Sequence, residues 1–374
     1  MIRPPKPPSA AAQDPFSLAR QRYQDHLDPV FVAALDSLGL AREFNQAEGS
    51  YIYDEHGNGY LDFVAGFGAG LLGHSHPVLI TRLQEALGSG QPALLPLGIS
   101  PSGAELAHRL CAVAGSAFTR VHFATTGTEA IEHALQVAMT VTGRRKFISS
   151  TNGYHGLTSG ALALAPAESP WRKPFSELDS NFVSMDLSDL SSLQEQVGPR
   201  DVAAVVLEVI QGFGGCREQD AVLEIHRLCS ETGTLVMIDE VLTGLGRTGA
   251  WFAFQQVDKD YYPHLVVVSK GLTGGTVPVS AVLMSEEVFQ AYTQAFDPGV
   301  DHHSTFAQNL LAMTAGLTCL EILEKEQLPH NALEMGKLLC QGLKALRDCG
   351  GSLIYTSLSQ QQVNKVRKEL EASD

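Results

Sequence analysis

The residues best suited to chemistry in this sequence are an aspartate and a lysine that each follow a short apolar run. Asp239 closes the run LVMI at 235–238, and Lys270 follows LVVV at 265–268 and one serine. Short continuous apolar runs that end in a turn are typical of buried parallel strands, whose carboxyl ends carry ligand sites. We therefore expect Asp239 and Lys270 to project into one crevice. Such a lysine can hold pyridoxal phosphate (PLP) as a Schiff base, and such an aspartate can pair with its pyridinium nitrogen.

An ordinary salt bridge, or an exposed lysine at a strand end, is the alternative for this pair, because most lysines lie on the surface. The glycines nearby favour a ligand site. Three glycines follow Asp239 within ten residues, and three follow Lys270 within five. Glycine lets a backbone approach a ligand closely, so the pattern indicates a binding crevice at both strand ends.

Two further turns supply candidates for holding a phosphate and a planar ring. The strand-like run at 121–124 leads into Gly127 and Thr128, which begin a helical pattern. A helix N-terminus binds phosphate, but a plain N-cap is an equally good interpretation of these residues alone. Tyr154 lies between glycines after a short run at 147–150. It can stack on a planar cofactor, although an aromatic residue more often packs in a core.

Bulk composition excludes several classes of protein. The chain has 374 residues, 44% of them hydrophobic, which suggests two domains or one large domain with a smaller appendage. The net charge of −15 argues against a nucleic-acid partner, and no apolar stretch is long enough to span a bilayer. The six cysteines form no CxxC pair and no zinc spacing, so we expect reduced thiols, no metal site and a cytoplasmic location.

The positioning elements alternate between apolar runs and helical patterns, which is typical of an α/β protein. A hairpin pattern lies at 51–63, and further strand-like runs lie at 202–207, where Glu208 follows, and at 278–284. Helical spacing of apolar residues occurs at 16–40, 78–87, 102–114, 221–232, 286–295, 309–323 and 333–346, with a polar helical pattern at 360–371.

From about residue 51 to residue 346 the sequence resembles the class III aminotransferases, which are PLP enzymes of fold type I. Each motif that supports the resemblance is weak evidence alone, but the order and spacing of all the motifs together are specific to this family. The motifs are TGTEA at 126–130, YHG at 154–156, EVIQG at 208–212, DEV at 239–241 with TGLGRTG at 243–249, SKGL at 269–272 and STF at 304–306.

The resemblance implies a fold type I architecture: a mostly parallel central sheet with helices on both faces, and a small domain made from the N- and C-terminal segments. The implied division is a disordered tail at 1–15, the N-terminal part of the small domain at 16–75, a large PLP-binding domain at 76–310 and a shortened C-terminal part of the small domain at 311–374.

The resemblance also implies residue roles. Lys270 would bind PLP covalently and move the substrate proton, and Asp239 would keep the ring nitrogen protonated. Thr305 would reach the phosphate of the neighbouring subunit, which implies a homodimer with shared sites. Tyr154 and Val241 would lie on the two ring faces, Gly127 and Thr128 would bind the phosphate, Glu208 would support the site, and His155 belongs to the same cofactor-binding set.

The implied activity is a PLP-dependent transaminase that moves an amino group from a primary amine or ω-amino compound to a keto acid or aldehyde acceptor. Leu242 stands where many members have Gln, and Phe213 stands where amino-acid-specific members have Glu. The resemblance therefore favours an amine donor. We expect Phe67, Gly68 and Phe213 to form an apolar pocket. An aminomutase or racemase on the same scaffold stays open.

The end of the chain is a further departure, because residues 350–374 do not resemble the C-terminal portion that carries the family's carboxylate-binding arginine. A truncated, non-catalytic homologue is therefore a third possibility, alongside the transaminase and the aminomutase or racemase.

Overall fold

The computed structural model describes residues 15–95, 97–175, 181–212, 215–297 and 304–348. The described residues up to Phe63 form one compact unit, and those from Val64 onward form a second, so each unit is described by itself. The domain boundaries expected from the sequence stay a prediction. The helix expected at 360–371 lies outside the described residues, as does all but the last residue of the expected tail.

The first unit contains two helices and a three-stranded antiparallel sheet in the order β1-β2-β3. The single helical pattern at 16–40 forms two helices, because the Asp28 carboxylate accepts hydrogen bonds from the N–H groups of Val30 and Phe31 at 2.8 and 3.0 Å. This cap starts a new helix. The elements are α1 (Pro15–His26), α2 (Pro29–Ser37), β1 (Phe44–Glu48), β2 (Tyr51–Asp54) and β3 (Gly59–Leu61).

The second unit is built on a seven-stranded sheet with the order β4-β10-β9-β8-β7-β5-β6. Strand β10 is antiparallel to both of its neighbours, and the remaining pairs are parallel, so the other strands share one direction. The mostly parallel sheet is confirmed. The strands are β4 (Arg120–Ala124), β5 (Lys146–Ser150), β6 (Phe182–Met185), β7 (Val202–Leu207), β8 (Leu235–Asp239), β9 (Leu265–Val268) and β10 (Ser280–Met284).

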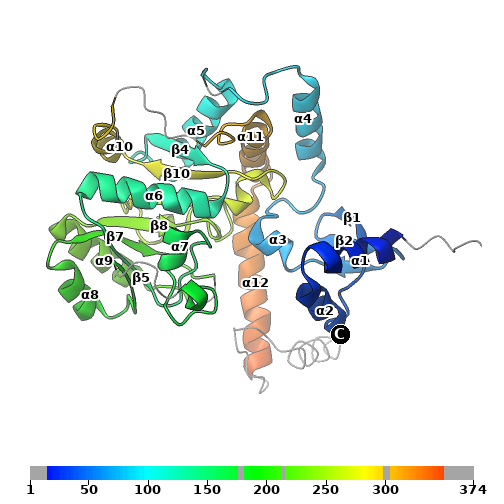
Figure 1. The fold of residues 1–374 in the computed structure, drawn as a ribbon, viewed down its shortest axis with the longest axis horizontal. Coiled ribbons are helices and arrows are strands. Elements are labelled where there is room, and N and C mark those ends of the chain that lie inside the picture. Colours follow the sequence, from blue (N-terminus) through cyan, green and yellow to red (C-terminus); the bar gives the residue numbers. More distant parts are fainter. Residues whose placement is uncertain (1–14, 96, 176–180, 213–214, 298–303, 349–374) are drawn as a thin grey trace, which may run out of the picture. The chain divides into compact units, whose positions relative to one another are not determined.

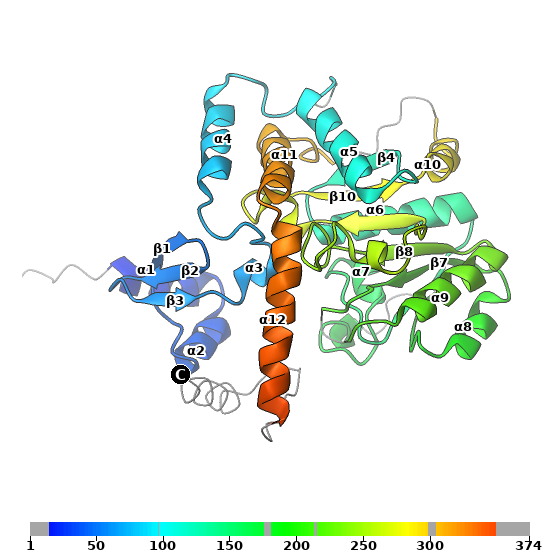
Figure 2. The ribbon, with the colours of Figure 1, turned by 180° about the vertical axis from the view of Figure 1, so that it is seen from behind.

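Helices cover both faces of this sheet. Figures 1 and 2 show α6 (Gly127–Thr142) on one face and α8 (Leu190–Val197) and α9 (Gln219–Thr232) on the other. Alternate strand residues enter two cores: Met237 packs with the α6 side, and Val236 packs with the α9 side. Burial on both faces explains why these strands are continuous apolar runs rather than alternating ones.

The remaining elements of the second unit pack around this layer, and α11 contacts both α4 and α5. No helix in the described ranges combines the length and the apolar composition needed to cross a membrane. These elements are α3 (Ala65–Gly68), α4 (Pro77–Gly88), α5 (Pro101–Ala114), α7 (Ser159–Ala163), η1 (Lys173–Phe175), η2 (Ala253–Gln256), η3 (Lys270–Thr273), α10 (Glu286–Thr293), α11 (Leu310–Lys325) and α12 (Leu328–Asp348).

Candidate active site

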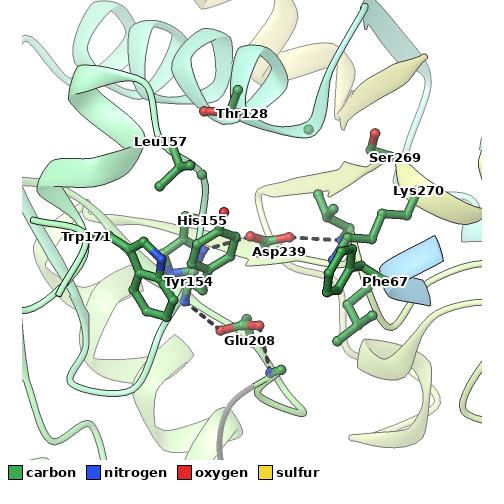
Figure 3. A pocket seen from close by; sticks show the side chains of 15 residues that line it. Phe67, Thr128, Tyr154, His155, Leu157, Trp171, Glu208, Asp239, Ser269 and Lys270 are labelled. Atoms are coloured by element: carbon green, nitrogen blue, oxygen red, sulfur yellow. Dashed lines mark hydrogen bonds and ion pairs between the residues drawn. The ribbon is translucent and has the colours of Figure 1, made fainter. Parts of the chain in front are cut away.

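A cavity of about 750 Å³ lies at the carboxyl ends of the parallel strands. Most of its lining residues lie at or shortly after the ends of β4, β5, β7, β8 and β9, as expected for ligand sites in open α/β sheets. Figure 3 shows the lining side chains from close by, with Asp239 near the centre and Lys270 to one side. The two residues that the sequence placed in one crevice therefore do share it.

Asp239 is buried at the end of β8, and both of its carboxylate oxygens are fixed. One oxygen accepts a hydrogen bond from the Val241 N–H at 2.9 Å, and the other accepts one from His155 Nδ1 at 2.7 Å. Burial lowers the pKa of His155, but the hydrogen bond and charge of Asp239 outweigh it and raise that pKa overall. The Asp239 carboxylate is therefore held rigidly as a hydrogen-bond acceptor at the cavity.

Glu208 follows β7 and is also buried at the cavity wall. Its carboxylate accepts hydrogen bonds from the Tyr154 N–H at 3.2 Å and from the Gly212 N–H at 3.1 Å. Burial, together with the charge of Asp239, raises the pKa of Glu208. This carboxyl group joins the loops after β5 and β7, so it positions Tyr154 against the cavity.

Lys270 begins η3 directly after Ser269 and lines the same cavity. Burial lowers the pKa of its ammonium group, although the charge of Asp239 opposes that effect. A lowered pKa leaves a larger fraction of neutral amine, which is the form that acts as a nucleophile or base. The side-chain amine of Lys270 can therefore act in this cavity as a nucleophile or as a base.

The N-terminus of α6 supplies the candidate anion site. Gly127 and Thr128 are its first two residues and line the cavity, and Thr126 caps the helix by accepting from the Glu129 N–H at 3.3 Å. The first N–H groups of a helix have no partner within the helix, and they attract anions. A Cβ atom at Gly127 would lie 3.2 Å from Val241 Cγ1, so glycine keeps this approach open.

Replacing Gly156 by alanine is expected to weaken binding of a phosphate-bearing ligand about 10-fold. Gly156 has φ +129°, and a Cβ atom there would lie 2.3 Å from Thr128 Oγ1 and 3.1 Å from its Cα, so Thr128 must move. Fluorescence titration with PLP measures the affinity. The matched control is Gly143→Ala, because Gly143 also has positive φ but has nothing within 4 Å of the added carbon. Equal PLP affinities for the two variants would contradict binding of the phosphate at Thr128.

The apolar part of the cavity lining includes Phe67, Leu157, Trp171 and Leu242. Leu242 is held by Arg247, whose Nε donates to the Leu242 carbonyl at 2.7 Å. The same guanidinium donates to the carbonyl of Gly68, next to Phe67. Of the expected apolar pocket, Phe67 lines the cavity, whereas Phe213 lies outside the described residues.

Glu240, the residue after the end of β8, does not line the cavity. Glu240 is buried and accepts hydrogen bonds from the Phe254 N–H at 2.8 Å and from the Thr243 hydroxyl. Burial raises the pKa of Glu240 to about 7, although the hydrogen bond from Thr243 opposes that effect. A carboxyl group with a raised pKa stabilises the fold below pH 4.5 and loses that contribution as pH rises through 7.

Glu240→Gln is therefore expected to gain stability relative to the parent as pH rises. The gain grows from about pH 5 to pH 8 and approaches roughly 3 kcal/mol, since each pKa unit corresponds to about 1.4 kcal/mol. Urea unfolding of both proteins across this range measures the difference. A difference that is the same at pH 5 and pH 8 would show that ionisation of Glu240 is not responsible.

The structure brings most of the sequence-predicted site residues together. Thr305 is the exception: it is exposed and does not line the cavity, so its role toward a neighbouring subunit stays a prediction. Leu157 and Trp171 line the cavity but were not predicted from the sequence. The residues that do share the cavity are Gly127, Thr128, Tyr154, His155, Glu208, Asp239, Val241 and Lys270.

The donor set fits PLP. A helix N-terminus with glycine at its first position suits the phosphate, and the buried Asp239 carboxylate suits a protonated ring nitrogen. Lys270 provides the primary amine in the same cavity. No group of three or more His, Cys, Asp or Glu side chains able to hold a metal occurs in the described ranges.

Comparisons with known proteins point in the same direction. The family model described as Aminotransferase class-III matches residues 34–353. Among curated proteins, the acetylornithine aminotransferase of Methanopyrus kandleri is 37% identical over 303 residues, 80% of this chain and 75% of its own. The acetylornithine aminotransferase of Archaeoglobus fulgidus is 38% identical over 304 residues, 80% of this chain and 77% of its own.

Solved structures with the same fold include two PLP complexes. The taurine:2-oxoglutarate aminotransferase of Bifidobacterium kashiwanohense, in complex with PLP and glutamate, matches with a TM-score of 0.75 and 27% identity, over 85% of this chain and 78% of its own. A PLP-bound amine transaminase from an uncultivated Pseudomonas species matches with a TM-score of 0.76 and 26% identity, over 82% of this chain and 76% of its own.

Proposed function

Because this chain belongs to the class III aminotransferases and is a PLP-dependent transaminase, we propose that its amino donor is a primary amine or an ω-amino compound. The acceptor in this proposal is a keto acid or an aldehyde. The observation that carries the choice of donor is the lining of the cavity. No arginine lines it in the described part of the chain, and Phe67, Leu157, Trp171 and Leu242 are apolar. Apolar groups on the reacting carbon of the donor would gain contact with this lining.

Bound PLP supplies an aldehyde that captures amines and a ring that withdraws electrons from the substrate carbon. In our proposal, Lys270 Nζ would hold the cofactor through its primary amine. The neutral amine of Lys270 would also take the proton from the donor carbon next to nitrogen. The lowered pKa of Lys270, caused by burial, supports this role as a base.

Asp239 would accept a hydrogen bond from the protonated ring nitrogen and keep that proton in place. His155 and the Val241 N–H hold the two carboxylate oxygens, so the charge needs no reorientation during the reaction. Tyr154 and Val241 would lie on opposite faces of the ring, and Glu208 would hold the Tyr154 backbone. The N–H groups of Gly127 and Thr128 would bind the phosphate.

We further propose a homodimer in which Thr305 completes the partner's phosphate site. Large apolar side chains beside this region, Leu97, Ile99 and Phe306, are 101%, 85% and 57% exposed. The N–H of Leu310 donates to the Ala93 carbonyl at 3.0 Å, so the two segments start side by side. Exposed apolar residues of this size are typical of surfaces that a second subunit covers. A monomeric mass for the active enzyme would overturn this assignment.

We place the enzyme in the cytoplasm. All cysteines in the described ranges are free thiols, and they include the buried Cys229 and Cys319. Free thiols are the usual state in a reducing compartment, which supports the cytoplasmic assignment.

Product stoichiometry tests the proposed reaction. The purified protein with PLP is incubated with a primary amine and a keto acid, together and separately. We expect carbonyl product and amino acid to form in equal amounts, and only when both substrates are present. Isomerised donor without any acceptor would indicate an aminomutase or racemase instead, and absence of every product would indicate a non-catalytic homologue.

The choice of donor is tested in the same assay. Acetylornithine, which appears in the names of the curated relatives, is compared with simple primary amines and with α-amino acids. We expect the highest kcat/KM for a donor without a carboxylate on the reacting carbon, a class that includes acetylornithine because its free amine is the ω-amine. A higher value for an α-amino acid would overturn the donor assignment and leave the transaminase reaction standing.

A further inference from the structure

We propose that Arg217 is a positioning residue for the cofactor: its guanidinium ties the end of β5 to the end of β7 and so holds Tyr154 and Glu208 at the cavity wall. This role rests on the placement of Tyr154 on one face of the PLP ring, which belongs to the proposed function. Arg217 does not line this cavity. It therefore acts through the two strand ends rather than on the reacting atoms.

The guanidinium bridges the two strands just beyond the point where their ladder stops. Strands β5 and β7 are parallel neighbours, and the last pair in their register is Ser149 with Val206. One residue further on, the Ser150 hydroxyl accepts a hydrogen bond from Arg217 Nη2 at 2.5 Å. Arg217 Nε donates to the carbonyl of Glu208, which follows β7, at 3.3 Å. The side chain therefore continues the connection between the strands toward the cavity.

Both strand ends that Arg217 joins carry a part of the cavity wall. Tyr154 lies four residues after Ser150, and the Glu208 carboxylate accepts a hydrogen bond from the Tyr154 N–H at 3.2 Å (Figure 3). The separation of the two strand ends decides whether this hydrogen bond can form. A shift of either end would move the Tyr154 ring relative to the cofactor, and small displacements of positioning groups lower both affinity and rate.

Arg217 is itself fixed in place. Its backbone N–H donates to the Val209 carbonyl at 2.9 Å, and its side chain is half-buried. Burial lowers the pKa of the guanidinium, but the charges of Asp186 and Glu208 oppose that effect. Arginine stays charged at ordinary pH, and its planar fork can donate to a hydroxyl and to a carbonyl at the same time. These properties suit a permanent bridge between two strand ends.

Amide hydrogen exchange of the cofactor-free protein tests the bridge without catalysis. Arg217→Met removes both side-chain hydrogen bonds and keeps a side chain of similar length. We expect the N–H groups of Tyr154 and Gly212, which both donate to Glu208, to exchange about 5-fold faster, as for the loss of one hydrogen bond. Unchanged exchange at these two amides would overturn the proposal.

Arg144→Met is the matched control, because Arg144 makes a similar bridge at the opposite edge of the same sheet. Its guanidinium donates to the carbonyls of Val202, the first residue of β7, and of Gly233 at 2.9 and 3.0 Å. We expect this variant to lose stability without faster exchange at Tyr154 and Gly212. Equal acceleration in both variants would show a general loosening of the sheet and would overturn the role of Arg217.

Arg217→Lys separates the geometry of the bridge from its charge, because a single ammonium nitrogen cannot take both donor positions. We expect Arg217→Lys and Arg217→Met to bind PLP about 5-fold more weakly than the parent in a fluorescence titration. The circular dichroism of the bound cofactor, which depends on how the ring lies in the site, should change in both variants and not in Arg144→Met. Parent values in Arg217→Lys would show that charge alone suffices and would overturn the bridge.

Ser150→Ala removes the acceptor at the β5 end of the bridge, which Gln211 Nε2 also uses at 2.8 Å. If Arg217 acts by tying β5 to β7, adding Arg217→Met to Ser150→Ala should weaken PLP binding little further. A second loss of about 5-fold in the double variant would show that Arg217 acts elsewhere, and would overturn the proposal.

Failure of the proposed function gives a different pattern. A parent protein that transfers no amino group from primary amines would overturn the proposed donor, while amide exchange, PLP affinity and circular dichroism still decide the role of Arg217. A parent protein that binds no PLP would overturn the placement of Tyr154 on a cofactor ring, and the positioning role with it.

Discussion

Lys270→Ala is expected to abolish transamination. The loss from missing proton transfer alone is roughly 10²–10⁴-fold, and loss of covalent attachment of the cofactor adds to it. The physical reason is that Lys270 is the primary amine that lines the cavity in the described part of the chain. Its burial lowers the pKa of the ammonium group and makes the base form accessible. Product formation from an amine and a keto acid, measured at steady state, checks the expected loss.

Lys270→Arg is the matched control, because it keeps the positive charge but provides no amine that can attack or readily lose a proton. Both variants should lose activity alike. Added methylamine should restore part of the rate in Lys270→Ala, since an external base can enter the space vacated by the side chain. Activity within 10-fold of the parent in Lys270→Ala would contradict the assigned role.

Asp239→Asn has the second largest expected effect, about 10²–10³-fold in the rate of amine deprotonation, comparable with removal of one preorganised electrostatic group. Asparagine has nearly the same shape, but it removes the negative charge that would hold the proton on the ring nitrogen. The amide oxygen of the asparagine can still accept a hydrogen bond from the Val241 N–H, which is at 2.9 Å in the parent. The hydrogen bond between His155 and residue 239, at 2.7 Å in the parent, is lost or has the asparagine NH2 as its donor. Stopped-flow absorbance with a single turnover of amine measures the rate.

Glu208→Gln is the control for Asp239→Asn. It removes a neighbouring buried charge but keeps an oxygen that accepts from one of the N–H groups of Tyr154 and Gly212. We expect a loss below about 10-fold, because Glu208 positions backbone rather than the reacting atoms. Equal losses in the two variants would show that general negative charge, rather than Asp239 itself, sustains the rate.

The sequence was sufficient to predict the sheet and the edge that carries the site. The strands ending at Asp239 and Val268 are continuous apolar runs because both of their faces are buried, and such runs are visible without any structure. Parallel strands place their carboxyl ends at one edge, so the grouping of Asp239 with Lys270 followed from topology alone. Local turn chemistry likewise predicted the start of α6 at Gly127.

Other parts of the site depend on contacts between distant residues. His155 and Asp239 are 84 positions apart, and both were named from motifs, but their hydrogen bond could not be predicted from spacing. Trp171 lies in a stretch without helical or strand periodicity, so nothing local predicted that Arg172 would anchor it beside Tyr154. At the other end of the chain, the break at Asp28 was missed because apolar spacing continues across it.

The most direct test of a transaminase site built on Lys270 is the visible absorption spectrum of the cofactor-free protein during sequential addition of PLP, an amine and a keto acid. We expect PLP to give a saturable visible band in the parent protein, the amine to remove this band, and the keto acid to restore it. Lys270→Ala should show no such cycle. A band that forms equally in Lys270→Ala and does not respond to the amine would contradict a transaminase site built on Lys270.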